Sequence, residues 1–539
     1  MQLIDRLDCP RLDRGSLDPS GFRLRQCRIG TVDLRGSTVE GAAVFEDCRF
    51  EELFLSETTR FACRAVFLRC TFREAVFDTA VFEEGIHLRH CRFLGTARFQ
   101  GATFGGEVRM EGTRFDRGMN FEYCHFAGAL EMEDGEVGGT ARFGRAEILG
   151  WADFSRTRFE AADFLRCRFQ SGAEFREAVF GRRFNFVEVD VAREAIFREA
   201  RFGGTADFSK VRVGRTLDLV RTRFDRGASL EGAVCGSDVH LQSSIWKGPA
   251  RMSGLRSVGH VHLDRARMSS PLRFLEGLIG RDLTMRNLRC FSRVDVRRLA
   301  VAGRVDLSEL ECSDSLVLEE LTAPELVLEG AYCSRDLLLC GAQVGRLVLD
   351  GVQVDNTLDG AGLRVQSELA CMGAQVGQLD LGYAQVRGKL ASQIRTDPQR
   401  GKEEFSFLAR GFQARSRYED MDEATLMERR MSRRSRLTRS AWNGVPCLLE
   451  WLFVDMACGY GLRPFRLLAT TAVVVLCFGI VYAVGSQNLG GGLGSSVVAF
   501  LSPDHSIEFE MPLIAVVESV LGIFLTALFI GTLTRKLAR

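Results

Sequence analysis

Apolar residues recur at a fixed interval through the middle of this chain. One run places an apolar residue at every eleventh position, beginning at Phe175 and ending at Leu318. A second series lies midway between the members of the first: Phe180, Val191, Phe202, Val213, Phe224 and Cys235. An α-helix repeats at about 3.6 residues and a strand at about 2, so neither explains a core residue at every fifth or sixth position. The pattern predicts a chain with five-residue sides that coils on itself.

The same spacing extends toward both ends, from about Leu24 to Leu390. A small residue stands two positions before many of the apolar ones, as Ala173 does before Phe175. Because side chains alternate across a strand, this small residue also faces inward. Each side of the coil therefore offers one small and one large group to the core.

Five segments show the repeating unit: ADFSR, ADFLR, AVFLR, AVFDT and AIFRE. A small residue, a central Phe and two polar or turn residues resemble the unit of the pentapeptide-repeat family, over residues 21–395. The resemblance implies a mainly β fold, a right-handed quadrilateral β-helix (a pentapeptide-repeat solenoid). One extra residue on every second side makes the coil about 22 residues long, which predicts about 17 coils and small bulges at alternate corners. We assign residues 1–20 to an N-terminal cap.

The charge of the chain is nearly balanced, with 71 basic and 70 acidic residues. Arg and Glu mix freely at the outward positions of the repeats, which is typical of a solvated face. Such a chain has no net electrostatic field over the whole molecule that would attract nucleic acid, so we do not expect nucleic acid as a partner. Family members that imitate DNA are acidic and soluble, so the resemblance does not extend to that role. A protein partner on the β-helix is expected but unknown.

Few residues suggest catalysis or metal binding. His260 and His262 share a strand face, but no third ligand is visible, so a solvated or packed pair is the better interpretation. The 17 cysteines form no CxxC pair, which indicates buried, reduced thiols. The sequence has no nucleophile elbow and no phosphate-binding loop. We therefore expect no enzyme, no cofactor and no metal.

The repeat dissolves near Leu390, and residues 396–440 predict a helical linker of two helices. The end of this linker is rich in arginine and precedes hydrophobic sequence, which favours contact with lipid head groups over binding to DNA. Residues 441–466 predict an amphipathic helix on the membrane surface, with a helix packed under the β-helix as the alternative. The residues expected to contact the membrane surface are Arg429, Arg430, Arg433, Arg434, Trp442 and Trp451.

Two later segments are long enough to cross a bilayer, and together they predict a transmembrane hairpin over residues 467–533. The first span has no charged residue, and the second has only Glu518. The outer loop 485–511 contains no Lys or Arg, whereas basic residues flank the other ends of both spans. The positive-inside rule places both termini in the cytoplasm, with residues 534–539 as a basic tail. We expect a two-span protein of a bacterial inner membrane.

The hairpin resembles the two-helix pore module of potassium channels, a module found at the end of bacterial pentapeptide-repeat proteins. The likeness rests on four segments: CGYGLRPFR, SSVVAF, ESVLGIF and LTRKLAR. A potassium filter stacks backbone carbonyls in a Thr-x-Gly-Tyr/Phe-Gly run. Here LSPDHSIEFE follows SSVVAF, with Pro503 and no glycine, so we do not expect potassium selectivity.

Two functions remain open. In the first, the hairpin anchors a cytoplasmic scaffold to membrane lipid, and Glu518 needs only a partner inside the helix bundle, such as Ser519 or Thr526 of a neighbour. In the second, a homo-oligomer, a tetramer if it is a pore, forms an ion channel with a degenerate filter. The residues of that pore or vestibule would be Glu518, Asp504, Glu508, Glu510 and Ser496.

Overall fold

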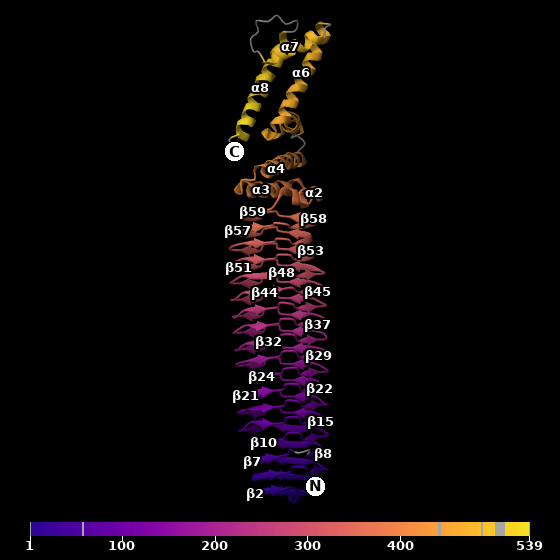
Figure 1. The fold of residues 1–539 in the computed structure, drawn as a ribbon, viewed down its shortest axis with the longest axis vertical. Coiled ribbons are helices and arrows are strands. Elements are labelled where there is room, and N and C mark those ends of the chain that lie inside the picture. Colours follow the sequence, from indigo (N-terminus) through magenta and orange to yellow (C-terminus); the bar gives the residue numbers. More distant parts are fainter. Residues whose placement is uncertain (1, 57–58, 440–443, 487–488, 502–511, 538–539) are drawn as a thin grey trace. The chain divides into compact units, whose positions relative to one another are not determined.

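The computed structural model describes residues 2–56, 59–439, 444–486, 489–501 and 512–537. The chain divides into two compact units (Figure 1). The first comprises Met1–Ser367 and Gln375–Gly377, and the second comprises Glu368–Ala374 and Gln378–Arg539. The first unit is a parallel β-solenoid, and the solenoid has about 17 turns, as the repeat spacing predicts. The second unit contains the helices.

One coil of the solenoid contributes two short strands to each of two sheets. The coil that starts at β27 continues through three further strands, which are β28 (Phe184–Asn185), β29 (Asp190–Val191) and β30 (Ala195–Ile196). Each strand pairs in parallel with its equivalent in the next coil, as Val179 of β27 (Val179–Phe180) does with Arg201 of β31 (Arg201–Phe202). The interval between these two residues is the coil length of 22 that the ladder predicts. Four short sides per coil are therefore confirmed.

The two five-residue steps of this coil, Phe175–Phe180 and Phe186–Val191, each contain a left-handed turn. Glu177 sits between β26 (Ala173–Glu174) and β27 with a φ of 57°, and Glu188 repeats this eleven positions later with a φ of 55°. A non-glycine residue there is strained. The turn backbone still bonds to the next coil, since Glu177 N donates to Arg198 O at 2.9 Å. The extra residue lies in the six-residue steps, such as Phe180–Phe186, where the chain bends at Gly181 and Arg182 and Gly181 N still donates to Phe159 O of the neighbouring coil at 2.8 Å.

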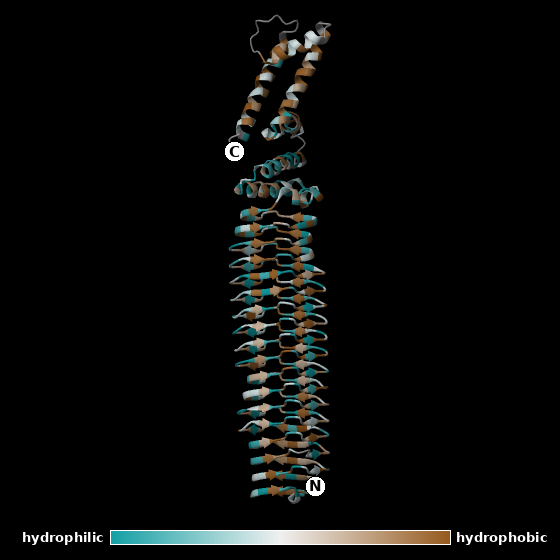
Figure 2. Ribbon diagram, viewed as in Figure 1, coloured by the Kyte–Doolittle hydropathy of each residue, from teal (hydrophilic) through white to brown (hydrophobic). Residues whose placement is uncertain are grey.

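The eleven-residue ladder forms the core. Phe175 stacks on Phe197 of the next coil, with ring centroids 4.7 Å apart and planes 2° apart. Phe186, half a coil away, meets Phe175 edge-on at 6.0 Å. All three side chains are fully buried, in both of the geometries that aromatic pairs prefer. Figure 2 shows the resulting alternation of apolar and polar residues along each coil.

The solenoid begins and ends earlier than the sequence pattern suggests. Strand β1 (Gln2–Asp5) pairs with β3 (Phe22–Arg25), and β2 (Asp8–Asp13) pairs with β4 (Arg28–Asp33). Most of the expected N-terminal cap is therefore a coil, one that lacks phenylalanine and so lacks the clearest signal. The last strand, β59 (Gln375–Asp380), ends well before residue 395.

Four helices follow the last strand. They are α1 (Tyr383–Val386), α2 (Ala391–Ile394), α3 (Pro398–Ala414) and α4 (Tyr418–Arg439). Asp397 caps α3, because its carboxylate accepts from the backbone N–H groups of Gln399 and Arg400 at 3.0 and 3.2 Å. Phe405, Leu408 and Phe412 form the buried face of α3, as their spacing predicts. The two longest of these helices occupy the expected linker.

The expected surface helix over residues 441–466 is short and interrupted. It consists of α5 (Gly444–Leu449), the π-helical turn η3 (Glu450–Met456) and the 3-10 turn η4 (Gly459–Gly461). Tyr460 adopts a φ of 56°, which ends any continuous helix there. The interrupted segment η3 contains Glu450 and Asp455, and both acids form ion pairs with arginines of α4.

Two long apolar helices form the C-terminal hairpin, α6 (Pro464–Ser486) and α8 (Pro512–Leu537), with α7 (Leu489–Leu501) between them. Their candidate spans are Pro464–Val484 and Leu513–Thr534, which confirms the two apolar segments. In the most apolar 18-residue stretch of each helix, only 22% of α6 and 28% of α8 is buried within the chain. A core helix of a soluble protein would bury its apolar side chains. Large apolar side chains on both α6 and α8, such as those of Ile480 and Val520, are instead exposed.

Candidate functional site

Among the described residues of the hairpin, the carboxyl group of Glu518 is buried between the helices. Glu518 of α8 is fully buried, and its Oε1 lies 2.5 Å from Ser496 Oγ of α7. Ser496 Oγ also lies 2.9 Å from the carbonyl oxygen of Val475 on α6. The Tyr482 hydroxyl of α6 faces the same carboxyl. The polar groups of three helices therefore meet at one point among apolar side chains.

The hydrogen-bond geometry suits a neutral carboxyl. A serine hydroxyl has one hydrogen, so Ser496 cannot donate to both Val475 O and Glu518 Oε1. Both contacts are hydrogen bonds if Glu518 carries a proton and donates it to Ser496, which in turn donates to Val475. Neutralisation also avoids the high cost of an unpaired charge buried among apolar side chains. Within the same chain, the Ser519 hydroxyl has a different partner, since it donates to Ala499 O at 2.7 Å.

Glycines allow α7 to approach both long helices closely. A Cβ at Gly492 of α7 would lie 2.4 Å from the backbone nitrogen of Ala483 on α6. A Cβ at Gly522 of α8 would lie 2.4 Å from the carbonyl oxygen of Phe500 on α7. Small residues at such contacts are the usual device of packed membrane helices. The glycine-rich stretch before Ser496 is thus part of a helix contact.

A second buried acid binds two arginines of α4. Asp455 of η3 is almost fully buried, and Arg430 donates to it from Nε and from a terminal nitrogen at 3.0 and 2.8 Å. Arg433 donates to the other carboxylate oxygen at 2.8 Å. Burial alone would raise the pKa of Asp455, but these hydrogen bonds outweigh it and hold the pKa below its ordinary value. Asp455 therefore ties the apolar segment 444–456 to α4.

A third arginine of α4 extends this network. Arg433 also donates to the Tyr460 hydroxyl at 3.0 Å, and that hydroxyl donates to Glu450 at 2.9 Å. Arg436 forms an ion pair with the same Glu450. Burial and the neighbouring Glu450 raise the pKa of Tyr460 to about 12, so its hydroxyl stays protonated as a donor. The arginine-rich end of α4 is in part an internal bonding surface.

The remaining residues singled out in the sequence have different positions. Arg429 and Arg434 are exposed on α4, and Trp451 of η3 is 45% exposed, so all three are accessible to lipid. Arg430 and Arg433 are engaged by Asp455, which competes with the expected contact to head groups. Four residues lie outside the described ones, namely Trp442, Asp504, Glu508 and Glu510.

Sequence reasoning did not single out Asp455 or Tyr482. Each carries the same signal, a polar group inside an apolar run: Asp455 in LLEWLFVDM and Tyr482 in VVVLCFGIVYAV. Such a residue needs a partner once it is buried. The arginine cluster on α4 and Glu518 on α8 are those partners, but they lie 22 and 36 positions away, and only the fold brings them together.

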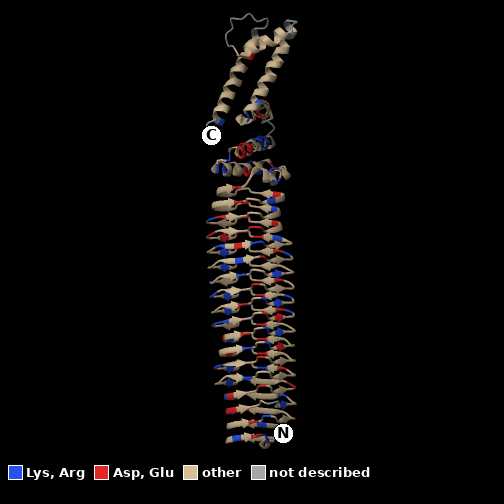
Figure 3. Ribbon diagram, in the orientation of Figure 1, with Lys and Arg blue, Asp and Glu red and all other residues tan. Residues whose placement is uncertain are grey.

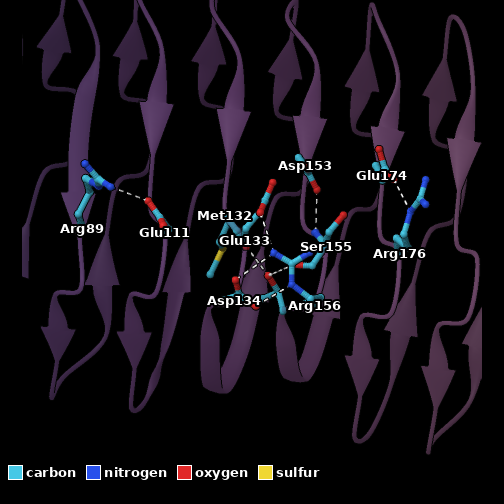
Figure 4. A network of polar contacts seen from close by, with 11 residues as sticks. Arg89, Glu111, Met132, Glu133, Asp134, Asp153, Ser155, Arg156, Glu174 and Arg176 are labelled. Carbon is cyan, nitrogen blue, oxygen red and sulfur yellow. Dashed lines mark hydrogen bonds and ion pairs between the residues drawn. The ribbon is translucent and has the colours of Figure 1, made fainter.

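The solenoid surface carries charges of both signs on all the visible coils (Figure 3). Many pairs join adjacent coils, as in the network of Figure 4, where Arg156 meets Asp134 at 2.9 Å and Glu133 at 2.8 Å. The Arg156 guanidinium holds the pKa of Asp134 below its ordinary value. Exposed ion pairs contribute about 0–1 kcal/mol each.

Several histidine side chains of the solenoid pack on their neighbours, and most of its cysteines are buried. His262 Nδ1 lies 2.9 Å from the Thr284 hydroxyl, and its ring stacks on that of His240 with centroids 5.4 Å apart. Within the described ranges, no group of three or more His, Cys, Asp or Glu is placed to hold a metal ion. The cysteines are free thiols, and burial raises the pKa of Cys167.

A family model described as pentapeptide repeats (9 copies) matches residues 77–125, 88–136, 164–212 and 186–234. The solenoid therefore contains pentapeptide repeats over these residues. No curated protein and no solved structure matches the chain. The resemblance of the hairpin to a potassium-channel pore domain therefore has no relative to support it and stays a prediction. Solenoids of this kind are typically structural or interaction proteins.

Proposed function

We propose that this protein is a membrane-anchored scaffold, in which the hairpin α6–α8 holds a pentapeptide-repeat solenoid at a bacterial inner membrane. The observation that carries the proposal is the exposure of the two apolar helices. Most of each 18-residue apolar window faces away from the chain. A surface of this size and composition needs a nonpolar surrounding, and a lipid bilayer supplies it.

The charges at the helix ends support a cytoplasmic solenoid. Arg463 and Arg466 flank the start of α6, and Lys536 lies at the end of α8. The segment between α6 and α8 contains no Lys or Arg. Positive residues are retained on the cytoplasmic side, so both termini belong there and α7 belongs at the outer side. The free, buried thiols of the solenoid suit the reducing cytoplasm.

The surroundings of Glu518 favour an anchor over a pore. A carboxylate that lines a conducting pathway faces water, whereas Glu518 is fully buried by helices of its own chain. Its contact with Ser496 completes the packing of α7 on α8 without help from a second copy. The hairpin can thus satisfy Glu518, the one acidic residue of its two apolar spans, as a single chain.

An oligomeric pore is the second candidate, and α7 is the observation that favours it. A short apolar helix between two spans has the position of a pore helix, and Ser496 lies on this helix. Planar bilayers distinguish the candidates. A pore predicts currents from the purified protein and an assembly of at least four chains, while an anchor predicts silent bilayers.

Membrane fractionation tests the anchor itself. The full chain should remain in the membrane pellet after an alkaline carbonate wash and should be released by mild detergent. Peripheral attachment through the arginines of α4 would be removed by the wash. Recovery of the full chain in the washed supernatant would overturn the proposal.

A further inference from the structure

The second unit contains a cleft with a basic end and an apolar wall. Its volume is about 790 Å³, and it lies among α4, η3, α6 and α8. It is at the end of the hairpin where α6 begins and α8 ends, since Thr532 of α8 lies close to Gly461, just before α6. Under the proposed topology this end is cytoplasmic. A ligand in this cleft would therefore lie at the inner face of the membrane.

The basic end has more positive charge than its own acid can neutralise. Four arginines line the cleft, two of them Arg434 and Arg466, against the single carboxylate of Asp455, which leaves an excess of three positive charges. Arg430 and Arg433 are held by Asp455. Arg434 and Arg466 are exposed, and the described part of the chain offers neither of them a carboxylate. These two guanidinium groups are available to an anion.

The apolar wall continues from the arginines along the hairpin. Val473 and Val474 of α6 face Leu521 and Phe524 of α8 across the cleft. From Arg466 to Val474 the helix rises by about 12 Å, at about 1.5 Å per residue. Free phosphate would use only the basic end, whereas a molecule with an anionic head and a hydrocarbon chain matches both ends.

We propose that this cleft binds one anionic phospholipid, with its phosphate between Arg434 and Arg466 and an acyl chain along Val473, Leu521 and Phe524. Guanidinium groups bind phosphate oxygens in a bidentate manner, which gives the head group a fixed position. Basic pockets between membrane helices on the cytoplasmic side bind such lipids. The inference rests on the proposed function, because it requires that the hairpin span the membrane.

Native mass spectrometry of the full chain tests this site. The protein is purified in mild detergent and given equal amounts of phosphatidylglycerol and phosphatidylcholine with identical acyl chains. We expect one phosphatidylglycerol to be retained in preference to phosphatidylcholine. Arg434→Gln and Arg466→Gln should each lower its retention about fivefold, from the usual contribution of one arginine near an anionic lipid. Arg429→Gln is the matched control, since Arg429 is an exposed arginine of α4 outside the cleft.

Three results would overturn the site. Equal retention of the two lipids would show that charge is not recognised. An equal loss in Arg429→Gln would indicate a diffuse basic surface in place of a cleft. Displacement of the lipid by millimolar inorganic phosphate would indicate a free phosphate site. If the wild-type chain resists carbonate but shows no preference, only the lipid site fails. If carbonate removes the chain from the membrane, the proposed function fails as well.

Discussion

The aromatic ladder allows a sharp prediction about how the solenoid responds to a cavity. Phe197→Ala removes a fully buried ring that stacks on Phe175 at 4.7 Å and meets Phe208 edge-on at 5.1 Å. A phenyl side chain buries about 200 Å², worth about 5 kcal/mol at about 25 cal/mol per Å². Alanine keeps part of that burial, so the expected loss is about 3–5 kcal/mol.

The loss should be local, because each coil contacts only its neighbours. Hydrogen exchange of the full chain, followed by mass spectrometry, measures this directly. Amides of the coils that contain β27 to β34 (Leu217–Asp218) should lose protection by at least about a hundredfold, at about 1.4 kcal/mol per tenfold. Amides of distant coils, such as β4 and β7 (Arg49–Phe54), should keep theirs. Arg201→Ala, an exposed residue of the next coil within the same β27 to β34 region, is the control and should change protection little.

Two outcomes would refute this reasoning. Equal loss of protection in every coil would show that the solenoid unfolds as one cooperative unit, so that stability is not a sum over neighbours. Unchanged protection in β27 to β34 would show that the ring adds little to the core. Either result would contradict the claim that stacked rings stabilise the solenoid coil by coil.

Three further predictions concern the buried polar groups. Asp455→Asn leaves Arg433 buried with a neutral partner and should destabilise the second unit by about 3–5 kcal/mol at pH 7 in thermal melts. Because the folded pKa of Asp455 is lowered, this difference should be full above the ordinary carboxyl pKa and fade as the pH falls through the lower folded value; a pH-independent difference would contradict the pairing. Ser496→Ala should cost about 1–3 kcal/mol and should couple to Glu518→Gln in a double-mutant cycle, whereas strict additivity would separate the two residues. Cys167 should resist alkylation until the solenoid unfolds, and rapid labelling of the native chain would contradict its burial.

The solenoid could be predicted almost completely from the sequence, because its periodic core is local. Residues eleven apart lie on opposite sides of one coil and residues 22 apart stack, so the ladder of Phe175, Phe186 and Phe197 describes the coil by itself. The first coil was missed because its inward positions are less aromatic, as with Leu12 and Leu17. The left-handed turns were also missed, since Glu177 and its equivalents are residue types that rarely adopt such a backbone.

The helical unit could be predicted only in outline. Hydropathy identifies α6 and α8, because a membrane span depends on length and composition alone. It does not show that Asp455 withdraws Arg430 and Arg433 from the surface, since that pairing joins elements more than 20 residues apart. Hydropathy also does not show that Ser496 of the same chain contacts Glu518. Polar pairing across a bundle requires the packing of α7, which no periodicity encodes.

The most direct test of the membrane anchor is the location of the C-terminus in cells. The full chain is fused at its C-terminus to green fluorescent protein or to alkaline phosphatase, and both fusions are expressed in a bacterium. A two-span hairpin with a cytoplasmic solenoid predicts a fluorescent membrane fraction and an inactive phosphatase. An active phosphatase with a dark fluorescent protein would place the C-terminus outside and contradict the account.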